Sequence, residues 1–184
     1  MIIIKSKVKN YKIIFTKKLD ISKKNNVFYI VDDFFSNGKN KILDLPINKT
    51  IYVKANELNK SYNNISNIIS KLLSKNIDKA SSIICIGGGT VQDISSFISH
   101  ILFRGINWKF IPTTLLSQGD SCIGSKISIN FKSIKNLLGG YWPPSEILLN
   151  INFLKSLPKK EIYSGLGEIS HYFYLSNLKN FKYF

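Results

Sequence analysis

The chain has 184 residues, a mass of 20.9 kDa, 44% hydrophobic residues and a mean hydropathy of +0.01. These values are typical of a globular protein with a hydrophobic core and exclude a disordered one. No apolar run approaches the roughly 18 residues that a membrane-spanning helix needs, and Lys5 follows the apolar start Met1–Ile4 at once, unlike a secretory signal. We therefore expect a cytoplasmic protein with no membrane partner.

The formal net charge of +15 and the pI of 9.8 raise the question of nucleic-acid binding. All 26 basic residues except Arg104 are lysines. Because arginine makes most bidentate contacts to phosphates and bases, a nucleic-acid reader would be expected to have more of it. The composition favours a lysine-rich surface and a binding site for an anionic small molecule, with no nucleic-acid partner.

The first half of the chain predicts four extended segments and one helix. The expected strands are Ile2–Ile4, Tyr11–Phe15, the buried run Val27–Val31 that Asp32 and Asp33 close, and Thr50–Lys54. Ser61 is in position to cap a helix whose apolar residues follow the spacing of one face: Ile65, Ile68, Ile69, Leu72 and Leu73. This helix is expected to pack on the core.

The second half alternates strands with helices. The apolar run Ser82–Ile86 is followed by Gly87-Gly88-Gly89-Thr90 and a helix-like stretch from Val91 to about Leu102, and Trp108–Ile111 is the next buried strand. Strand, glycine turn and helix follow each other in the order that binds phosphate groups in parallel α/β sheets. We expect an α/β fold, with a Rossmann-like domain and a parallel sheet over residues 1–150.

The character of the sequence changes near Pro143-Pro144. A last strand, Ile147–Leu149, precedes Pro158 and a helix-like stretch from Lys159 to about Leu175. Residues 151–184 are expected to begin a helical second domain, and they are too few to bury a core of their own. The chain is therefore expected to be a fragment of a longer protein.

The two cysteines lie 37 positions apart, and the chain has no CxxC motif, so neither a zinc knuckle nor a disulfide framework is predicted. Cys85 lies in an apolar run and is expected in the core. Cys122 falls in a polar stretch that is expected to be a loop, where its thiol could be reactive, although no neighbouring residue indicates it.

Three groups of residues could perform chemistry. In the first, GGGTVQD (87–93), glycines after a strand let backbone N–H groups approach a diphosphate, although the same turn could simply pack a helix on a strand. Asp93 is expected in the first helical turn, where it could cap N–H groups or contact a ligand hydroxyl. The second group comprises Pro112–Lys126 with Lys135-Asn136, whose lysines and Asn, presented from glycine-bearing loops, suit a phosphate or polyol pocket.

The third group is a helical pair. Glu168 and His171, spaced i, i+3, share a helix face and could hold a metal ion, although two ligands are too few for a catalytic zinc. A solvated or hydrogen-bonded couple is the alternative.

Together these motifs resemble the 3-dehydroquinate synthase family, the sugar-phosphate cyclases of the iron-alcohol-dehydrogenase-like superfamily. Order and spacing agree from about Lys54 to Tyr172, over the stretches NELNK (56–60), GGGTVQD (87–93), RGI (104–106), PTTLLSQGDSCIGSK (112–126), KNLLG (135–139) and LKSLPKKEIYSGLGEISHY (154–172). The resemblance implies a Rossmann-like NAD domain, a helical domain that binds a divalent metal (zinc or cobalt), an active site between them, and a homodimer.

The resemblance also implies an activity. Family members convert 3-deoxy-D-arabino-heptulosonate 7-phosphate to 3-dehydroquinate and phosphate, in the shikimate pathway. The steps are transient oxidation by NAD, phosphate elimination, re-reduction and an intramolecular aldol closure, so the enzyme is a lyase. The small-molecule partner is accordingly a sugar phosphate.

Residue roles follow from the same resemblance. The positions that match NAD contacts are Glu57, Lys60, Gly88, Gly89, Asp93, Thr113, Thr114, Lys126 and Lys135. The positions that match catalytic or substrate-binding residues are Asp120, Lys126, Lys135, Asn136, His171 and Arg104, the last reaching the neighbouring subunit's phosphate site. Glu168 matches the first metal ligand.

The chain departs from the family pattern at several positions. His171 stands where the family has lysine, Ser125 replaces the second glycine of GGK, and Gln92 replaces the glycine before Asp93. The remaining metal ligands, two histidines, are expected beyond residue 184. These departures leave two alternatives open: a cyclase for another sugar phosphate, or a non-catalytic, truncated NAD-binding paralogue. A polyol dehydrogenase of the same superfamily is disfavoured, because Lys126 with Lys135-Asn136 forms a phosphate-type pocket that a simple alcohol does not require.

Overall fold

A computed structural model describes residues 1–19, 26–36 and 44–176. Its centre is a seven-stranded sheet in the order β1-β2-β9-β6-β5-β3-β4. Every neighbouring pair is parallel except β1–β2 at one edge. The strands are β1 (Ile2–Ile4), β2 (Tyr11–Phe15), β3 (Val27–Asp32), β4 (Thr50–Val53), β5 (Ser82–Gly87), β6 (Asn107–Pro112) and β9 (Glu146–Leu149).

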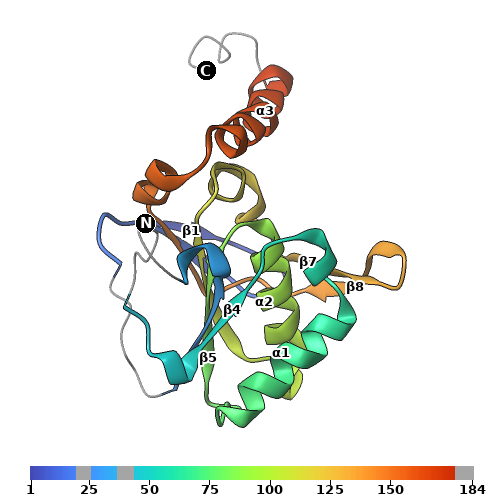
Figure 1. Ribbon diagram of the computed structural model, residues 1–184. Helices are drawn as coiled ribbons and strands as arrows, with labels where there is room; N and C mark the ends of the chain where they lie inside the picture. The colour runs from blue at the N-terminus through green and yellow to red at the C-terminus, as the bar shows by residue number, and fades with distance from the viewer. Residues whose placement is uncertain (20–25, 37–43, 177–184) are drawn as a thin grey trace.

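Two helices, α1 (Tyr62–Ser74) and α2 (Gly89–Ile101), lie side by side on one face of the sheet (Figure 1). Helix α1 buries Ile65, Ile68 and Leu72 at the predicted helical spacing. Helix α2 is buried on most of its surface because it lies between the sheet and a separate hairpin of β7 (Lys126–Phe131) and β8 (Ile134–Tyr141). The main hydrophobic core forms between these layers.

Short 3₁₀ turns cover part of the opposite face. Phe35 in η1 (Asp33–Phe35) and Phe153 in η7 (Ile151–Ser156) meet edge to face, with ring centroids 5.6 Å apart. They pack in a second apolar cluster with strand residues Val27, Tyr29, Val31, Ile84, Ile86 and Ile111. The other short turns are η3 (Ile47–Lys49), η4 (Glu57–Asn59), η5 (Leu102–Arg104) and the π-helical η6 (Ser117–Ser121).

Helix α3 (Lys159–Ser176) lies beyond the sheet, above the turn η6 (Figure 1). Two glycines let it approach closely: a Cβ on Gly165 would lie 2.8 Å from Leu115 Cβ, and one on Gly119 would lie 2.6 Å from Ile169 Cδ1. The predicted helix from Lys159 is confirmed to Ser176, while 177–184 of the predicted second domain lie outside the described residues. No helix among the described residues is long and apolar enough to span a bilayer.

The predicted α/β class and every predicted strand are confirmed, most with ends displaced by one residue. Helix α2 begins at Gly89, two residues earlier than the prediction, because Gly88 takes the N-cap position. Asp93 is therefore in the second helical turn, and the prediction that it lies in the first turn is wrong.

The hairpin β7–β8 was not predicted. Lys126, Lys135 and Asn136 are strand residues, which corrects the expectation that loops present them. The strand-like alternation of β7, in which Ile127 and Ile129 are buried, could have revealed it. The turn was harder to recognise because it has no Asn-Gly or Asp-Gly pair.

Cys122 is fully buried, which corrects the expectation of a loop cysteine that could be reactive. Its Sγ lies 3.5 Å from the carbonyl oxygen of Gln118, and burial raises the pKa of its thiol to about 12. Cys85 is buried in the core as predicted, and burial raises its thiol pKa as well. Neither thiol is available as a thiolate near neutral pH.

We expect the folded protein to resist a thiol reagent such as DTNB at about pH 8, because both cysteine thiols stay protonated and the reagent cannot reach them. In denaturant, both cysteines should react at once. One equivalent of fast-reacting thiol in the folded protein would contradict the burial of Cys122.

Candidate functional site

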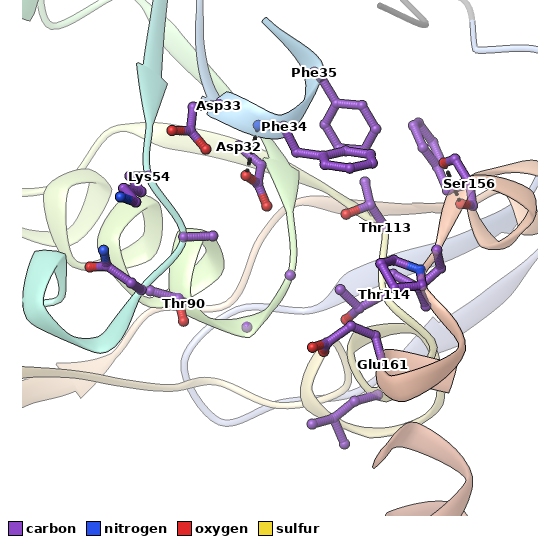
Figure 2. A pocket seen from close by; sticks show the side chains of 18 of the residues that line it. Asp32, Asp33, Phe34, Phe35, Lys54, Thr90, Thr113, Thr114, Ser156 and Glu161 are labelled. Atoms are coloured by element: carbon purple, nitrogen blue, oxygen red, sulfur yellow. Dashed lines mark hydrogen bonds between the residues drawn. The ribbon is translucent and has the colours of Figure 1, made fainter. Parts of the chain in front are cut away.

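A cavity of about 530 Å³ opens where four parallel strands end (Figure 2). The carboxyl ends of β3, β4, β5 and β6 contribute one side, and η7 with the start of α3 contributes the other. In open parallel sheets this edge is where ligands bind. The lining residues are Asp32, Asp33, Phe34, Phe35, Lys54, Ala55, Asn56, Gly88, Gly89, Thr90, Thr113, Thr114, Leu116, Phe153, Ser156, Leu157, Pro158, Glu161 and Ser164.

The N-terminus of α2 forms part of this cavity. No side chain caps it, so its first backbone N–H groups are not used by a capping residue. A Cβ on Gly88 would lie 2.9 Å from Thr114 Cγ2, so glycine is needed for the close approach of the turn to Thr114. The Thr114 hydroxyl is fixed in turn by Ser117 Oγ at 2.8 Å. This arrangement suits an anion.

Two carboxylates lie on the opposite side of the cavity from Thr113 and Thr114, at the end of β3 (Figure 2). Asp32 Oδ1 accepts a hydrogen bond from the Phe34 N–H at 3.1 Å. Burial raises the pKa of Asp32, the Phe34 N–H partly offsets that rise, and the neighbouring Asp33 adds to it. These aspartates, predicted only to close a strand, carry carboxylate oxygens in the cavity wall, and such oxygens accept hydrogen bonds from hydroxyl groups.

A second cavity, of about 540 Å³, lies on the other side of Gly89. Gln92 and Ser121 form a reciprocal pair on its wall: Gln92 Nε2 donates to Ser121 O at 2.7 Å, and Ser121 Oγ donates to Gln92 Oε1 at 2.9 Å. This pair ties η6 to α2. The lining residues are Gly89, Gln92, Asp93, Ser121, Ile123, Gly124, Ser125, Lys126 and Tyr141.

A polar network adjoins this cavity. Lys60 is buried, and its Nζ lies 2.5 Å from Asp93 Oδ2 and donates to Asn136 Oδ1 at 2.7 Å. Burial raises the pKa of Asp93, and Lys60 partly offsets the rise. The network joins α2, the segment before α1 and the hairpin at one point.

Asp120 lies in η6, and its Oδ1 accepts a hydrogen bond from the Tyr172 hydroxyl of α3 at 2.8 Å. Glu168 and His171 lie exposed on the same helix. Within the described part of the chain, no three His, Cys, Asp or Glu side chains gather into a group that could hold a metal ion.

The structure brings most of the predicted residues together. Gly88, Gly89, Thr113 and Thr114 line the first cavity, and Gly89, Asp93 and Lys126 line the second. Glu57, Lys60 and Asn136 belong to the polar network beside them. The predicted residues that lie outside both cavities and outside this network are Arg104, Asp120, Lys135, Glu168 and His171.

Sequence reasoning missed several residues of the first cavity, above all Asp32, Asp33 and Phe153. An acidic pair directly after a buried strand is a signal that could have identified Asp32 and Asp33. Phe153 gave no such signal, because its position depends on how η7 folds back over the sheet.

A family model described as 3-dehydroquinate synthase N-terminal matches residues 50–164. The chain belongs to the 3-dehydroquinate synthase family. The matched range contains the whole lining of the second cavity, the polar network, and the lining of the first cavity except residues 32–35. The sequence resemblance is confirmed at family level.

Two similar proteins are named 3-dehydroquinate synthase. The chain is 37% identical over 142 residues to the 3-dehydroquinate synthase of Ruminiclostridium cellulolyticum, covering 76% of this chain and 39% of the relative. It is 36% identical over 169 residues to that of Saccharolobus solfataricus, covering 91% and 43%. The chain thus spans about two fifths of the length of these relatives.

Solved structures share the fold. The 2-epi-5-epi-valiolone synthase from Streptomyces hygroscopicus, with NAD⁺ and Zn²⁺ bound, gives a TM-score of 0.73 at 21% identity, covering 86% of this chain and 48% of that one. A 2-deoxy-scyllo-inosose synthase complexed with carbaglucose-6-phosphate, NAD⁺ and Co²⁺ gives 0.64 at 22% identity, covering 76% and 40%.

The Tyr172–Asp120 contact predicts a pH-dependent link between α3 and η6. The hydrogen bond to the Asp120 carboxylate raises the pKa of Tyr172, so the contact is complete below the ordinary tyrosine pKa and is lost as pH rises through the folded value. In Asp120→Asn the Tyr172 midpoint should fall. A ¹³C-tyrosine NMR titration measures this, with the other tyrosine signals as controls; an unchanged Tyr172 midpoint would show that the contact does not form.

Proposed function

We propose that this chain is the nucleotide-binding part of a sugar-phosphate cyclase of the 3-dehydroquinate synthase type. It acts on 3-deoxy-D-arabino-heptulosonate 7-phosphate, with NAD in the first cavity and the sugar phosphate in the second. The observation that supports this most is Gly89, which lines both cavities at the start of α2. A cofactor and a substrate bound on either side would meet at that residue. On this proposal residues 1–150 form the NAD domain, and 151–184 begin the helical domain.

The first cavity fits a dinucleotide. Its volume lies within the range of about 300–1,000 Å³ that is usual for small-molecule sites. The uncapped amides of α2 would receive the diphosphate, and the Asp32 and Asp33 carboxylates would accept hydrogen bonds from ribose hydroxyls. When bound, NAD supplies a hydride acceptor that returns the hydride later in the cycle. The chain's own contribution is to hold and orient it.

The second cavity fits a phosphorylated, hydroxyl-rich ligand. Lys126 supplies a cation in its wall, while Asp93 and the Gln92–Ser121 pair supply hydrogen-bonding groups. Asn136 and Lys135 follow on β8, where Asn136 is held by Lys60. On this proposal Lys126 and Asn136 bind near the phosphate, and Asp120, freed from Tyr172, contacts substrate hydroxyls.

The described residues do not complete a metal site. Glu168 is proposed as one ligand of a zinc or cobalt ion, because its carboxylate is exposed on α3, where a metal ion could bind it together with other ligands. We also propose a homodimer in which Arg104, exposed in the turn η5, reaches the neighbouring subunit.

A cyclase for another sugar phosphate is the second candidate, and His171 favours it. Imidazole is shorter than the lysine chain that the family pattern has at this position, and it offers two ring nitrogens in place of a flexible ammonium group, so a phosphate or carboxylate there would be recognised differently. Phosphate release from a panel of phosphorylated ketoses separates the two substrates. A non-catalytic NAD-binding role would give binding without phosphate release.

Titration with NAD⁺ tests the proposed function. A ligand present at about 100 times its Kd stabilises the fold by about 2.7 kcal/mol, which raises the midpoint of thermal unfolding. Gly88→Val should weaken NAD⁺ binding at least about tenfold, because the new side chain meets Thr114 and covers the amides.

Gly167→Ala is the matched control, because a Cβ at Gly167 meets nothing within 4 Å. It should bind NAD⁺ like the unmodified chain. Equal NAD⁺ affinity for Gly88→Val and Gly167→Ala, or no shift in the unmodified chain at millimolar NAD⁺, would refute the proposed cofactor site.

A further inference from the structure

Asn130 lies in β7, only 8% exposed, between residues that the proposed function assigns to ligand binding. It lines neither cavity. Its hydrogen bonds nevertheless reach Glu57, Lys60 and Asn136. Glu57 lies 73 positions from Asn130 along the chain, and Asn136 lies 6 positions from it.

The side chain of Asn130 uses both ends of its amide. Its Nδ2 donates to Glu57 Oε1 at 2.8 Å, and its Oδ1 accepts from the backbone N–H of Asn136 at 2.8 Å. The backbone N–H of Asn130 donates to the carbonyl oxygen of Lys60, also at 2.8 Å. One buried residue therefore holds two segments together.

An amide is the chemistry that this place requires. Aspartate would keep the acceptor for Asn136 but would place a second carboxylate against Glu57, and leucine would leave both partners without a hydrogen bond. The bond to Asn136 has a further effect, since Asn136 has a φ of 54°, in the left-handed region that residues other than glycine seldom adopt.

The Asn136 side chain depends on this backbone conformation. Its Oδ1 accepts hydrogen bonds from both Lys60 Nζ at 2.7 Å and Ser128 Oγ at 3.0 Å. Lys60 in turn pairs with Asp93, which lines the second cavity. A change at Asn130 would therefore pass through Asn136 and Lys60 to the wall of the second cavity. It would also reach Glu57, whose neighbour Asn56 lines the first cavity.

We propose that Asn130 is a positioning residue that orients the Glu57 carboxylate for the cofactor and the Asn136 amide for the sugar phosphate. The inference rests on the proposed function, because it assumes that Glu57 and Asn136 meet these ligands. It assigns Asn130 no contact with either ligand.

A swap of donor and acceptor tests this. In Asn130→Asp, the two facing carboxylates repel, and calorimetry should show NAD⁺ affinity about tenfold weaker, the order expected for losing a buried, charge-assisted hydrogen bond. Adding Glu57→Gln restores a donor opposite the new carboxylate. The double variant N130D/E57Q should then bind NAD⁺ as E57Q alone does, a coupling that general destabilisation would not produce.

Ser81→Ala is the stability control. Ser81 is buried, and its Oγ donates to Asp78 Oδ1 at 2.6 Å just before β5, at the opposite edge of the sheet from the cavities. It should lower the unfolding midpoint without changing NAD⁺ affinity. If N130D does not fold, N130D/E57Q should fold and bind like E57Q.

The outcomes separate the two proposals. No NAD⁺ binding by the unmodified chain overturns the proposed function. If the unmodified chain binds NAD⁺, equal affinity of N130D overturns the role of Asn130. A double variant N130D/E57Q that does not fold, or that binds NAD⁺ more weakly than E57Q, also overturns that role.

Discussion

The start of α2 is the constraint on which the site depends. A parallel sheet brings the ends of its strands to one edge, and β5 ends there in Gly87, directly before the glycine N-cap of α2. Backbone N–H groups at the start of a helix have no partner within the helix and carry a partial positive charge. Gly88 lies too close to Thr114 to accept a side chain, no side chain caps the helix, and Gly88 and Gly89 line the first cavity.

Charge is arranged around that start in a consistent way. Acidic side chains at the end of β3 lie across the first cavity, where hydroxyl groups of a nucleotide would find acceptors. The second cavity has Lys126 in its wall, and the buried Lys60 pairs with Asp93 beside it. Lysine therefore contributes to the site locally, through Lys54 in the first cavity, Lys126 in the second and Lys60 beside it, while the net charge of +15 says little about the ligand.

Local patterns predicted the fold well. The buried strands Val27–Val31 and Ser82–Ile86 were visible because strands covered on both faces are continuously apolar, and α1 was visible from its one-sided apolar spacing. The hairpin was missed because its turn lacks a recognisable dipeptide and because Asn136 adopts a positive φ. Asn130 stabilises this conformation by accepting a hydrogen bond from the Asn136 N–H, and the spacing of apolar residues in the sequence does not reveal such a contact between strands.

The site was predicted only in part, because some of its residues have a local sequence signal and others reach it only through the packing of distant segments. The glycine turn and the Thr113-Thr114 pair are local signals, and both line the first cavity. Phe153 reaches that cavity only through the way η7 packs on Phe35. Asp120 and Tyr172 meet only because α3 packs on η6, which no periodicity in the sequence specifies.

Hydrogen–deuterium exchange of the chain with and without NAD⁺ tests the central claim most directly. The account predicts that NAD⁺ slows exchange of the amides at 88–91 and at 113–114, with smaller protection at 32–35 on the opposite side of the first cavity. Protection confined to other segments, or uniform protection with no maximum at the start of α2, would contradict it.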